Sequence, residues 1–207
     1  MTDIYYRVLR DVPQPVGRNS ATAYLNKVLP PIWASQYPET NGELLTVTLG
    51  GKQGEVGAVS TMFDLQRKKS GTADRVVAVW GLSKAEPAKT RDTGRMAGFL
   101  KGAWSVAYPG RDRGHFFAHT MGGSTDINLF PQLLSVNRGG EWRRMEQYAA
   151  DNPGTFCFIR PIYKGSSWTP SELEYGIFKL PPNDPFKFWV FMFLQPNVVI
   201  RIFCIPI

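Results

Sequence analysis

The order of the strand-like segments constrains the fold most, because these segments lie on both sides of a central polar loop and one helix-like segment. They are rich in Val, Thr, Leu and aromatic residues and are bounded by glycine and proline, as β-strands are. We predict strands over residues 44–49, 56–59, 75–82, 103–107, 155–163, 172–180, 187–194 and 198–205. Strands before and after a central helix are typical of an α+β fold with a mixed, mainly antiparallel sheet.

Two segments have helical composition. Residues 20–29 begin with a capping serine, and we expect Pro30 and Pro31 to end this helix. Residues 141–150 form the second, and the Asp-Asn-Pro-Gly run over 151–154 is a strong stop signal. Between them, residues 84–94 read as a polar, basic loop.

The chain is basic, with 24 Lys and Arg against 17 Asp and Glu and a net charge of +7. Much of the excess lies in residues 67–101, just before the motifs described below. Such a distribution favours a polyanionic partner, and a nucleic acid backbone is the natural candidate. A solvated loop face is the alternative explanation for a charge run taken alone.

The two ends of the sequence carry no recognisable targeting or membrane segment. Residues 1–10 lack the apolar region of a secretory signal peptide, and the apolar residues 186–207 are interrupted well short of the ~20 residues of a membrane span. We expect no membrane contact, and either a cytoplasmic protein or one exported by a specialised secretion system. Cys157 and Cys204 lie in predicted strands, and the sequence leaves open whether they pair.

The two histidines of the chain, His115 and His119, lie in one segment dense with Gly, Asp, Asn and Arg. A neutral imidazole can accept a proton near neutral pH. A hard divalent cation takes oxygen ligands, including the amide oxygen of asparagine. Arginines can clamp phosphate oxygens. The segment supplies several of each kind of group, which favours phosphodiester cleavage.

The ordered motifs Asp112-Arg113-Gly114-His115, Asn128-Leu-Phe-Pro-Gln132 and Asn137-Arg138-Gly, with Trp142 and Glu146 following, extend this prediction. This set resembles the DNA/RNA non-specific endonucleases of the His-Me finger (ββα-metal) superfamily. The resemblance covers roughly residues 111–178. It implies a metal-dependent nuclease that acts on DNA, with RNA as a further candidate substrate, and that uses Mg²⁺ or another divalent cation such as Mn²⁺.

The resemblance also implies roles for individual residues. His115 is expected to be the general base, Arg113 to bind phosphate, and Asn137 to ligate the metal. Asn128 and Glu146 are expected to support the metal and its waters. For substrate contacts we expect Arg138 and one of the adjacent pair Arg143 and Arg144, with Arg143 preferred, and an upstream arginine, either Arg91 or Arg95, of which we select Arg95 by position only.

One departure from the family pattern concerns the spacing of Asn137 and Glu146. Better-known members have one residue fewer between the corresponding positions. At about 100° per residue, nine steps along one continuous helix would put the two side chains on opposite faces. The helix that carries Glu146 must therefore start after Gly139 and Gly140, or Glu146 lies outside the site; the two glycines can absorb the extra residue as a turn.

The chain is expected to form a single nuclease domain over residues 1–207. Its parts would be N-terminal strands and a basic loop over 1–100, the ββα-metal finger over 101–150 and C-terminal strands over 151–207. Family members include antibacterial toxin domains held by a dedicated inhibitor. The lack of a signal peptide favours this toxin branch, with an immunity protein as partner.

Two alternatives remain open at this stage. A non-catalytic nucleic-acid-binding protein with a degenerate finger would use the basic segment over 67–101 and would not need His115. A zinc-dependent hydrolase would use His115 and His119 together, but Phe116 stands where a HExxH site needs Glu. For His119 we favour a structural role.

Overall fold

The computed structural model describes residues 4–5, 7–8, 11, 18–37, 43–65, 74–98, 109–124, 128–138, 140–165, 167, 169–178 and 201–206. The strands predicted over 103–107 and 187–194 lie outside these residues, and so does much of the basic segment over 67–101.

The described chain is built around an antiparallel sheet of six strands in the order β1-β2-β3-β6-β7-β8. The strands are β1 (Leu44–Leu49), β2 (Val59–Asp64), β3 (Arg75–Leu82), β6 (Phe156–Ile162), β7 (Glu172–Phe178) and β8 (Arg201–Pro206). This arrangement confirms the predicted α+β class with a mainly antiparallel sheet.

The strand predicted over 56–59 is wrong, because β2 begins only at Val59. Val56 forms a single isolated bridge to Leu82. Between Val56 and Val59, Gly57 has a φ of 86°, a left-handed conformation that interrupts an extended strand. The sequence pattern indicated an extended apolar segment beginning at Val56 but did not indicate the turn at Gly57.

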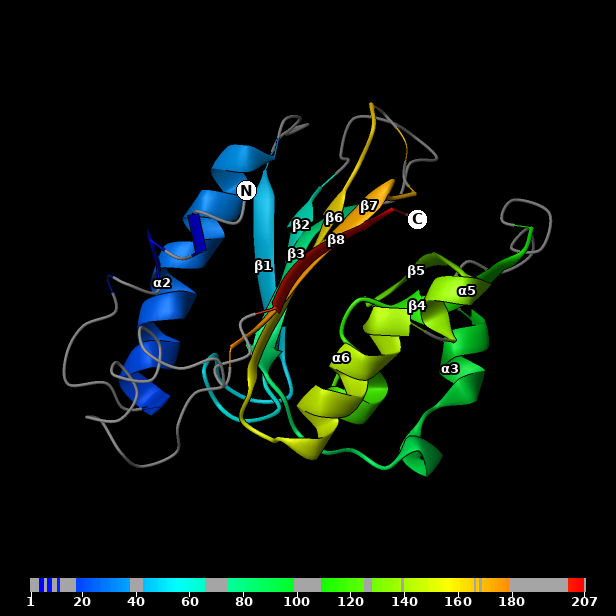
Figure 1. Ribbon diagram of the computed structural model, residues 1–207, viewed down its shortest axis with the longest axis horizontal. Coiled ribbons are helices and arrows are strands. Elements are labelled where there is room, and N and C mark those ends of the chain that lie inside the picture. Colours follow the sequence, from blue (N-terminus) through cyan, green and yellow to red (C-terminus); the bar gives the residue numbers. More distant parts are fainter. Residues whose placement is uncertain are drawn as a thin grey trace.

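Helix α2 (Arg18–Gln36) covers one face of the sheet (Figure 1). The predicted end before Pro30 is wrong, since the helix continues through both prolines. The reason lies in packing beyond them: Trp33 is fully buried, and its ring lies 5.3 Å from Trp80 and 5.3 Å from Phe158. Burial of a large aromatic side chain outweighs the local cost of the missing backbone donors.

The opposite face of the sheet carries a hairpin followed by helices (Figure 1). Strands β4 (Arg111–His115) and β5 (Leu129–Leu133) pair antiparallel, and α5 (Leu134–Asn137) and α6 (Gly140–Asp151) follow. This is the ββα order expected of the finger, and α6 confirms the predicted helix over 141–150. The short helices η1 (Ala88–Thr90), α3 (Thr93–Gly98) and η2 (His119–Met121) complete this side.

Helix α6 docks on the sheet through its apolar side. Trp142, Met145 and Ala149 are buried in one cluster with Ile159 of β6 and Tyr175 of β7. The Trp142 and Tyr175 rings meet edge to face at 5.4 Å. This packing fixes α6, and the residues that it carries, against the rigid sheet.

The two cysteines lie on strands that are not neighbours. Cys157 is in β6 and Cys204 in β8, with β7 between them. Adjacent strands lie ~4.8 Å apart, so two steps across the sheet exceed the ~7 Å limit between the Cα atoms of a disulfide. This geometry excludes the pairing that the sequence left open, and Cys157 is a buried free thiol.

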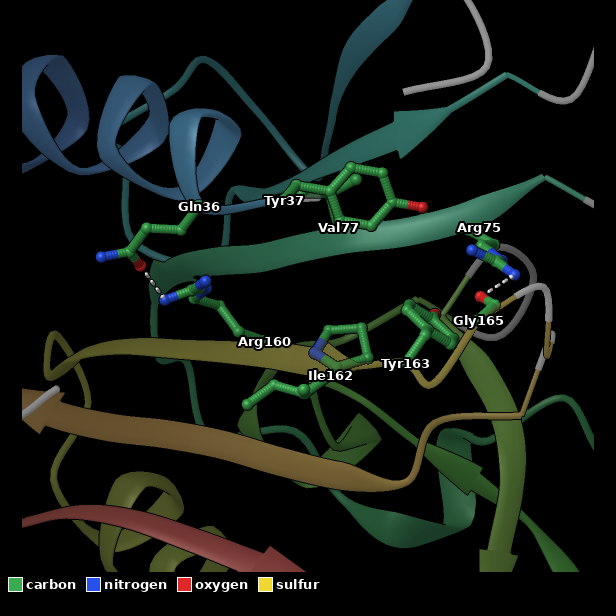
Figure 2. Close-up of a pocket in the computed structure, with 9 residues that line it drawn as sticks. Gln36, Tyr37, Arg75, Val77, Arg160, Ile162, Tyr163 and Gly165 are labelled. Carbon is green, nitrogen blue, oxygen red and sulfur yellow. Dashed lines mark hydrogen bonds between the residues drawn. The ribbon is translucent and has the colours of Figure 1, made fainter. Parts of the chain in front are cut away.

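A small cavity of about 170 Å³ lies beneath the end of α2, against β3 and β6 (Figure 2). Two arginines line it, and both have protein partners: Arg160 binds Gln36 at 2.7 Å and Glu174 at 2.7 Å, and Arg75 donates to the Gly165 carbonyl at 2.9 Å. The cavity is therefore part of a polar contact region between the end of α2 and the sheet.

Among the described helices, none combines the length and apolar character that a membrane span requires.

Candidate active site

A cavity of about 330 Å³ opens on the finger side of the molecule. Residues from β4, η2, α5 and α6 line it, together with three residues that flank η1, η2 and α5: Arg91, Arg113, His115, Ala118, Thr120, Asn137, Arg138, Arg143 and Glu146. Four guanidinium groups thus face one carboxyl group. Such a cavity is suited to an anion of the size of a phosphodiester.

His115 is the last residue of β4 and is only 7% exposed. Within the described part of the chain, its Nε2 atom is buried and has no hydrogen-bond partner. Burial, followed by the charge of Arg91 and the influence of His119, lowers the pKa of His115 to about 3. The imidazole is therefore neutral at physiological pH and able to accept a proton.

The strand geometry explains how His115 reaches the cavity. Alternate residues of a strand point to the same face, so Arg113 and His115 are directed together and Gly114 faces the other way. A Cβ atom on Gly114 would collide with the side chain of Gln132 on β5. Glycine at this position allows the close pairing of β4 and β5 that holds His115 in place.

Asn137 ends α5 and lines the same cavity. Its Nδ2 group donates to Oδ2 of Asp112 at 2.9 Å. The amide oxygen is then the remaining polar atom of this side chain, and it is the atom that a hard cation prefers. The same carboxylate accepts from Nε and Nη2 of Arg138, each at 2.9 Å.

Glu146 is carried by α6, is 7% exposed and also lines the cavity. Nε1 of Trp142 donates to its Oε1 at 2.9 Å, and Nη1 of Arg143 lies 3.7 Å from Oε2. Burial raises the pKa of Glu146 to about 7, although Arg143 and Trp142 oppose the shift. Near neutral pH the carboxyl is therefore partly protonated, and a cation nearby would favour its ionised form.

The separation of Asn137 and Glu146 onto two helices, which the spacing required, is present, although the second helix begins at Gly140 and not after it. Helix α5 ends at Asn137, and α6 begins at Gly140, whose φ of 69° is left-handed. Because the two helices are separate, Asn137 and Glu146 line one cavity despite the nine steps between them. The oxygens of these two side chains fit a hard divalent cation that completes its shell with water and phosphate oxygens.

A family model described as DNA/RNA non-specific endonuclease matches residues 65–177, more than half of the chain. The chain belongs to this family. Among solved structures, that of the Sda1 nuclease with bound zinc ion is 15% identical, with a TM-score of 0.34, and the match covers 66% of this chain and 77% of that one. A search of curated proteins finds no match.

Membership of the endonuclease family favours the enzyme over the binding protein among the classes left open above. The protein is a hydrolase that cleaves phosphodiester bonds. The cavity is consistent with this conclusion, since His115 and Asn137 are both present and both line it.

The structure separates the arginine candidates of this endonuclease. Arg113, Arg138 and Arg143 line the cavity, whereas Arg144, the neighbour of Arg143, does not. Of the two upstream candidates, Arg91 lines the cavity, and its Nε is buried with no hydrogen-bond partner among the described residues. The side chain of Arg95, which the sequence analysis selected, lies outside the described residues. Position in the sequence alone did not distinguish Arg91 from Arg95.

Asn128, the other predicted metal residue, lies outside this cavity. It is 1% exposed and is absent from the cavity lining. Its Oδ1 accepts from the Phe117 amide at 2.7 Å, and its Nδ2 donates to the carbonyl groups of Phe117 and Ser124. The carboxamide thus ties the loop between β4 and β5 together, and we do not place it in the metal site.

His119 begins η2 and is buried, and its Nε2 lies 2.9 Å from Oγ1 of Thr90. This contact joins η1 to η2 and agrees with a structural role. The zinc alternative required both histidines on one helix face, but His115 lies on a strand. Among the described residues, no group of three or more His, Cys, Asp or Glu side chains is placed to hold a metal.

Asp112 is the functional candidate to which the sequence analysis assigned no role. It was quoted only as part of the motif before His115. Its partners, Asn137 and Arg138, are more than twenty residues away in the sequence, and no local pattern links them.

Proposed function

We propose that this protein is a metal-dependent endonuclease in which His115 is the general base and Asn137 is the protein ligand of a divalent cation, with Mg²⁺ or Mn²⁺ as the candidates. The observation that carries the proposal is that one cavity contains a buried imidazole nitrogen with no partner in the described part of the chain, a carboxamide and four arginines. These are the groups that hydrolysis of a phosphodiester requires.

In this proposal, Nε2 of His115 removes a proton from a water molecule in line with the scissile bond. The low pKa of His115 keeps it in the accepting form, and the negative charge of a bound phosphate makes the imidazole more basic when substrate is present. Arg113 and Arg91 bind the phosphate oxygens, while Arg138 and Arg143 contact the neighbouring backbone.

Asn137 and Glu146 are the residues that would hold the cation. A divalent cation bound there supplies charge neutralisation on the phosphoryl oxygens and the leaving oxygen. Glu146, held by Trp142, would accept hydrogen bonds from waters around the cation.

Plasmid cleavage tests the proposal. We expect nicking and linearisation of plasmid DNA with Mg²⁺ or Mn²⁺, and none in EDTA. His115→Ala should lower the cleavage rate by about 100-fold or more. The matched control is Arg144→Gln on the exposed side of α6, which should cleave at nearly the wild-type rate. Intact plasmid under every metal condition would refute the proposal.

We propose DNA as substrate, and RNA also, because the groups in the cavity contact only the phosphodiester backbone and carry no base information. Incubation of the same protein with a structured RNA under the same metal conditions tests the second substrate. RNA that stays intact while DNA is degraded would restrict the activity to DNA.

We further propose an antibacterial role, with export by a specialised secretion system and a dedicated immunity protein. The four arginines around the cavity support an inhibitor with an acidic surface. Expression in a bacterial cytoplasm should arrest growth and degrade DNA, and His115→Ala should abolish both effects. Normal growth with an enzyme that cleaves DNA in vitro would contradict this role.

A further inference from the structure

Asp112 does not line the cavity but contacts two residues that do. On β4, the residues that line the cavity are Arg113 and His115. The side chain of Asp112 is 23% exposed. From this position it reaches Nδ2 of Asn137 at 2.9 Å and forms two 2.9 Å hydrogen bonds with Arg138.

The chemistry of this contact distinguishes the two ends of the Asn137 amide. Asp112 forms a salt bridge with Arg138, in which Nε of Arg138 donates to Oδ2 and Nη2 donates to Oδ1 of the carboxylate. An ionised carboxylate accepts hydrogen bonds but cannot donate them. It therefore binds only the NH₂ end of the amide, and the oxygen must take the other position.

We infer that Asp112 is a positioning residue that orients the carboxamide of Asn137 so that its oxygen is presented to a divalent cation in the cavity. This inference rests on the proposed role of Asn137 as cation ligand. Without the carboxylate, rotation of the amide by 180° would place the NH₂ group toward the cation, where it cannot act as a ligand.

The consequence is measurable as metal affinity, apart from catalysis. Loss of a group that orients a metal ligand typically lowers metal affinity by about 10- to 100-fold. We expect Asp112→Asn to weaken Mn²⁺ binding by about 10-fold or more, measured by calorimetry or by the spin resonance signal of free Mn²⁺ with metal-free protein. The new amide can either accept or donate a hydrogen bond, so it no longer selects one orientation of Asn137.

The decisive comparison repeats this substitution in an Asn137→Asp background. A carboxylate has two equivalent oxygens and needs no orientation. Asp112 would also repel it. In this background, Asp112→Asn should therefore leave Mn²⁺ affinity unchanged or raise it. If Asp112→Asn lowers Mn²⁺ affinity equally in both backgrounds, Asp112 has a general structural role and the inference is overturned.

One control variant isolates the contact. Asp151→Asn makes the same chemical change at an exposed position of α6, where the partner is Gln147. It should bind Mn²⁺ as the wild type does, and a loss of affinity equal to that with Asp112→Asn would overturn the inference.

Asn137→Ala separates failure of the inference from failure of the proposed function. If this variant binds Mn²⁺ like the wild type, Asn137 is not the ligand and both fail. If Asn137→Ala loses Mn²⁺ while Asp112→Asn does not, only the inference fails. Circular dichroism reports whether each variant is folded. If Asp112→Asn does not fold, Asp112→Ser replaces it. This variant must lower Mn²⁺ affinity when residue 137 is Asn and must not lower it in the Asn137→Asp background.

Discussion

At the scale of single residues, burial drives the two central titratable groups toward their uncharged forms. It lowers the pKa of His115 to about 3 and raises that of Glu146 to about 7. Both shifts have burial as their largest cause. The cavity therefore holds a neutral base and a carboxyl that ionises near neutral pH.

Glu146→Gln tests this effect through stability. The pKa of Glu146 in the folded protein lies above its ordinary value of 4.5, so its contribution to stability is complete below that pH and is lost as pH rises through about 7. Relative to Glu146→Gln, the metal-free wild type should lose roughly 3 kcal/mol between pH 4.5 and 8, since one pKa unit corresponds to about 1.4 kcal/mol.

Urea unfolding of both proteins in EDTA at several pH values measures this difference. Because His115 titrates in both proteins, its opposite contribution cancels. A difference in unfolding free energy that does not change with pH would contradict the raised pKa.

At the scale of elements, the break between α5 and α6 decides whether Asn137 and Glu146 share a cavity. The sequence indicated the need for a break, because nine steps along one helix separate the two faces. The structure supplies it with a left-handed residue, Gly140, at the start of α6.

Gly140→Ala should lower the unfolding free energy by about 1 kcal/mol, because a residue with a Cβ is strained at positive φ. Apart from its chain neighbours and its own helix backbone, no heavy atom of the described residues lies within 4 Å of the position that this Cβ would occupy, so we assign the cost to the backbone. Gly140→Asn should cost less, since asparagine tolerates this conformation. Urea unfolding of the three proteins tests the order, and an alanine variant as stable as the wild type would refute it.

At the scale of the whole molecule, the sheet has a separate apolar core on each face. One core packs α2 and contains Trp33, and the other packs α6 and contains Trp142. On the α2 side, a buried ion pair joins Arg160 of β6 to Glu174 of β7 at 2.7 Å, and Tyr5 also donates to Glu174. Neither charged residue lines the active-site cavity.

Glu174→Leu should therefore destabilise the protein by about 3 to 5 kcal/mol, because it leaves Arg160 buried without its counterion. The double variant Arg160→Met/Glu174→Leu should recover most of the loss. Denaturant unfolding measures stability, and plasmid cleavage by the folded fraction should stay at the wild-type rate in both. A double variant no more stable than the single one would contradict this explanation.

The sequence alone was sufficient for the α+β class, the strands over 44–49 and 75–82, the helix over 141–150 and the motifs around His115 and Asn137. These depend on local periodicity, turn residues and motif order, which are properties of neighbouring positions. The roles of the site residues remain proposals.

Only the tertiary structure decided the features that depend on contacts between distant residues. Packing of Trp33 against the sheet allows α2 to continue through Pro30 and Pro31. Hydrogen bonds within the loop between β4 and β5 hold the side chain of Asn128 outside the cavity. The contact of Asp112 with Asn137 likewise joins two elements. Local sequence patterns do not contain such partners, because the partners are set by how the elements pack against one another.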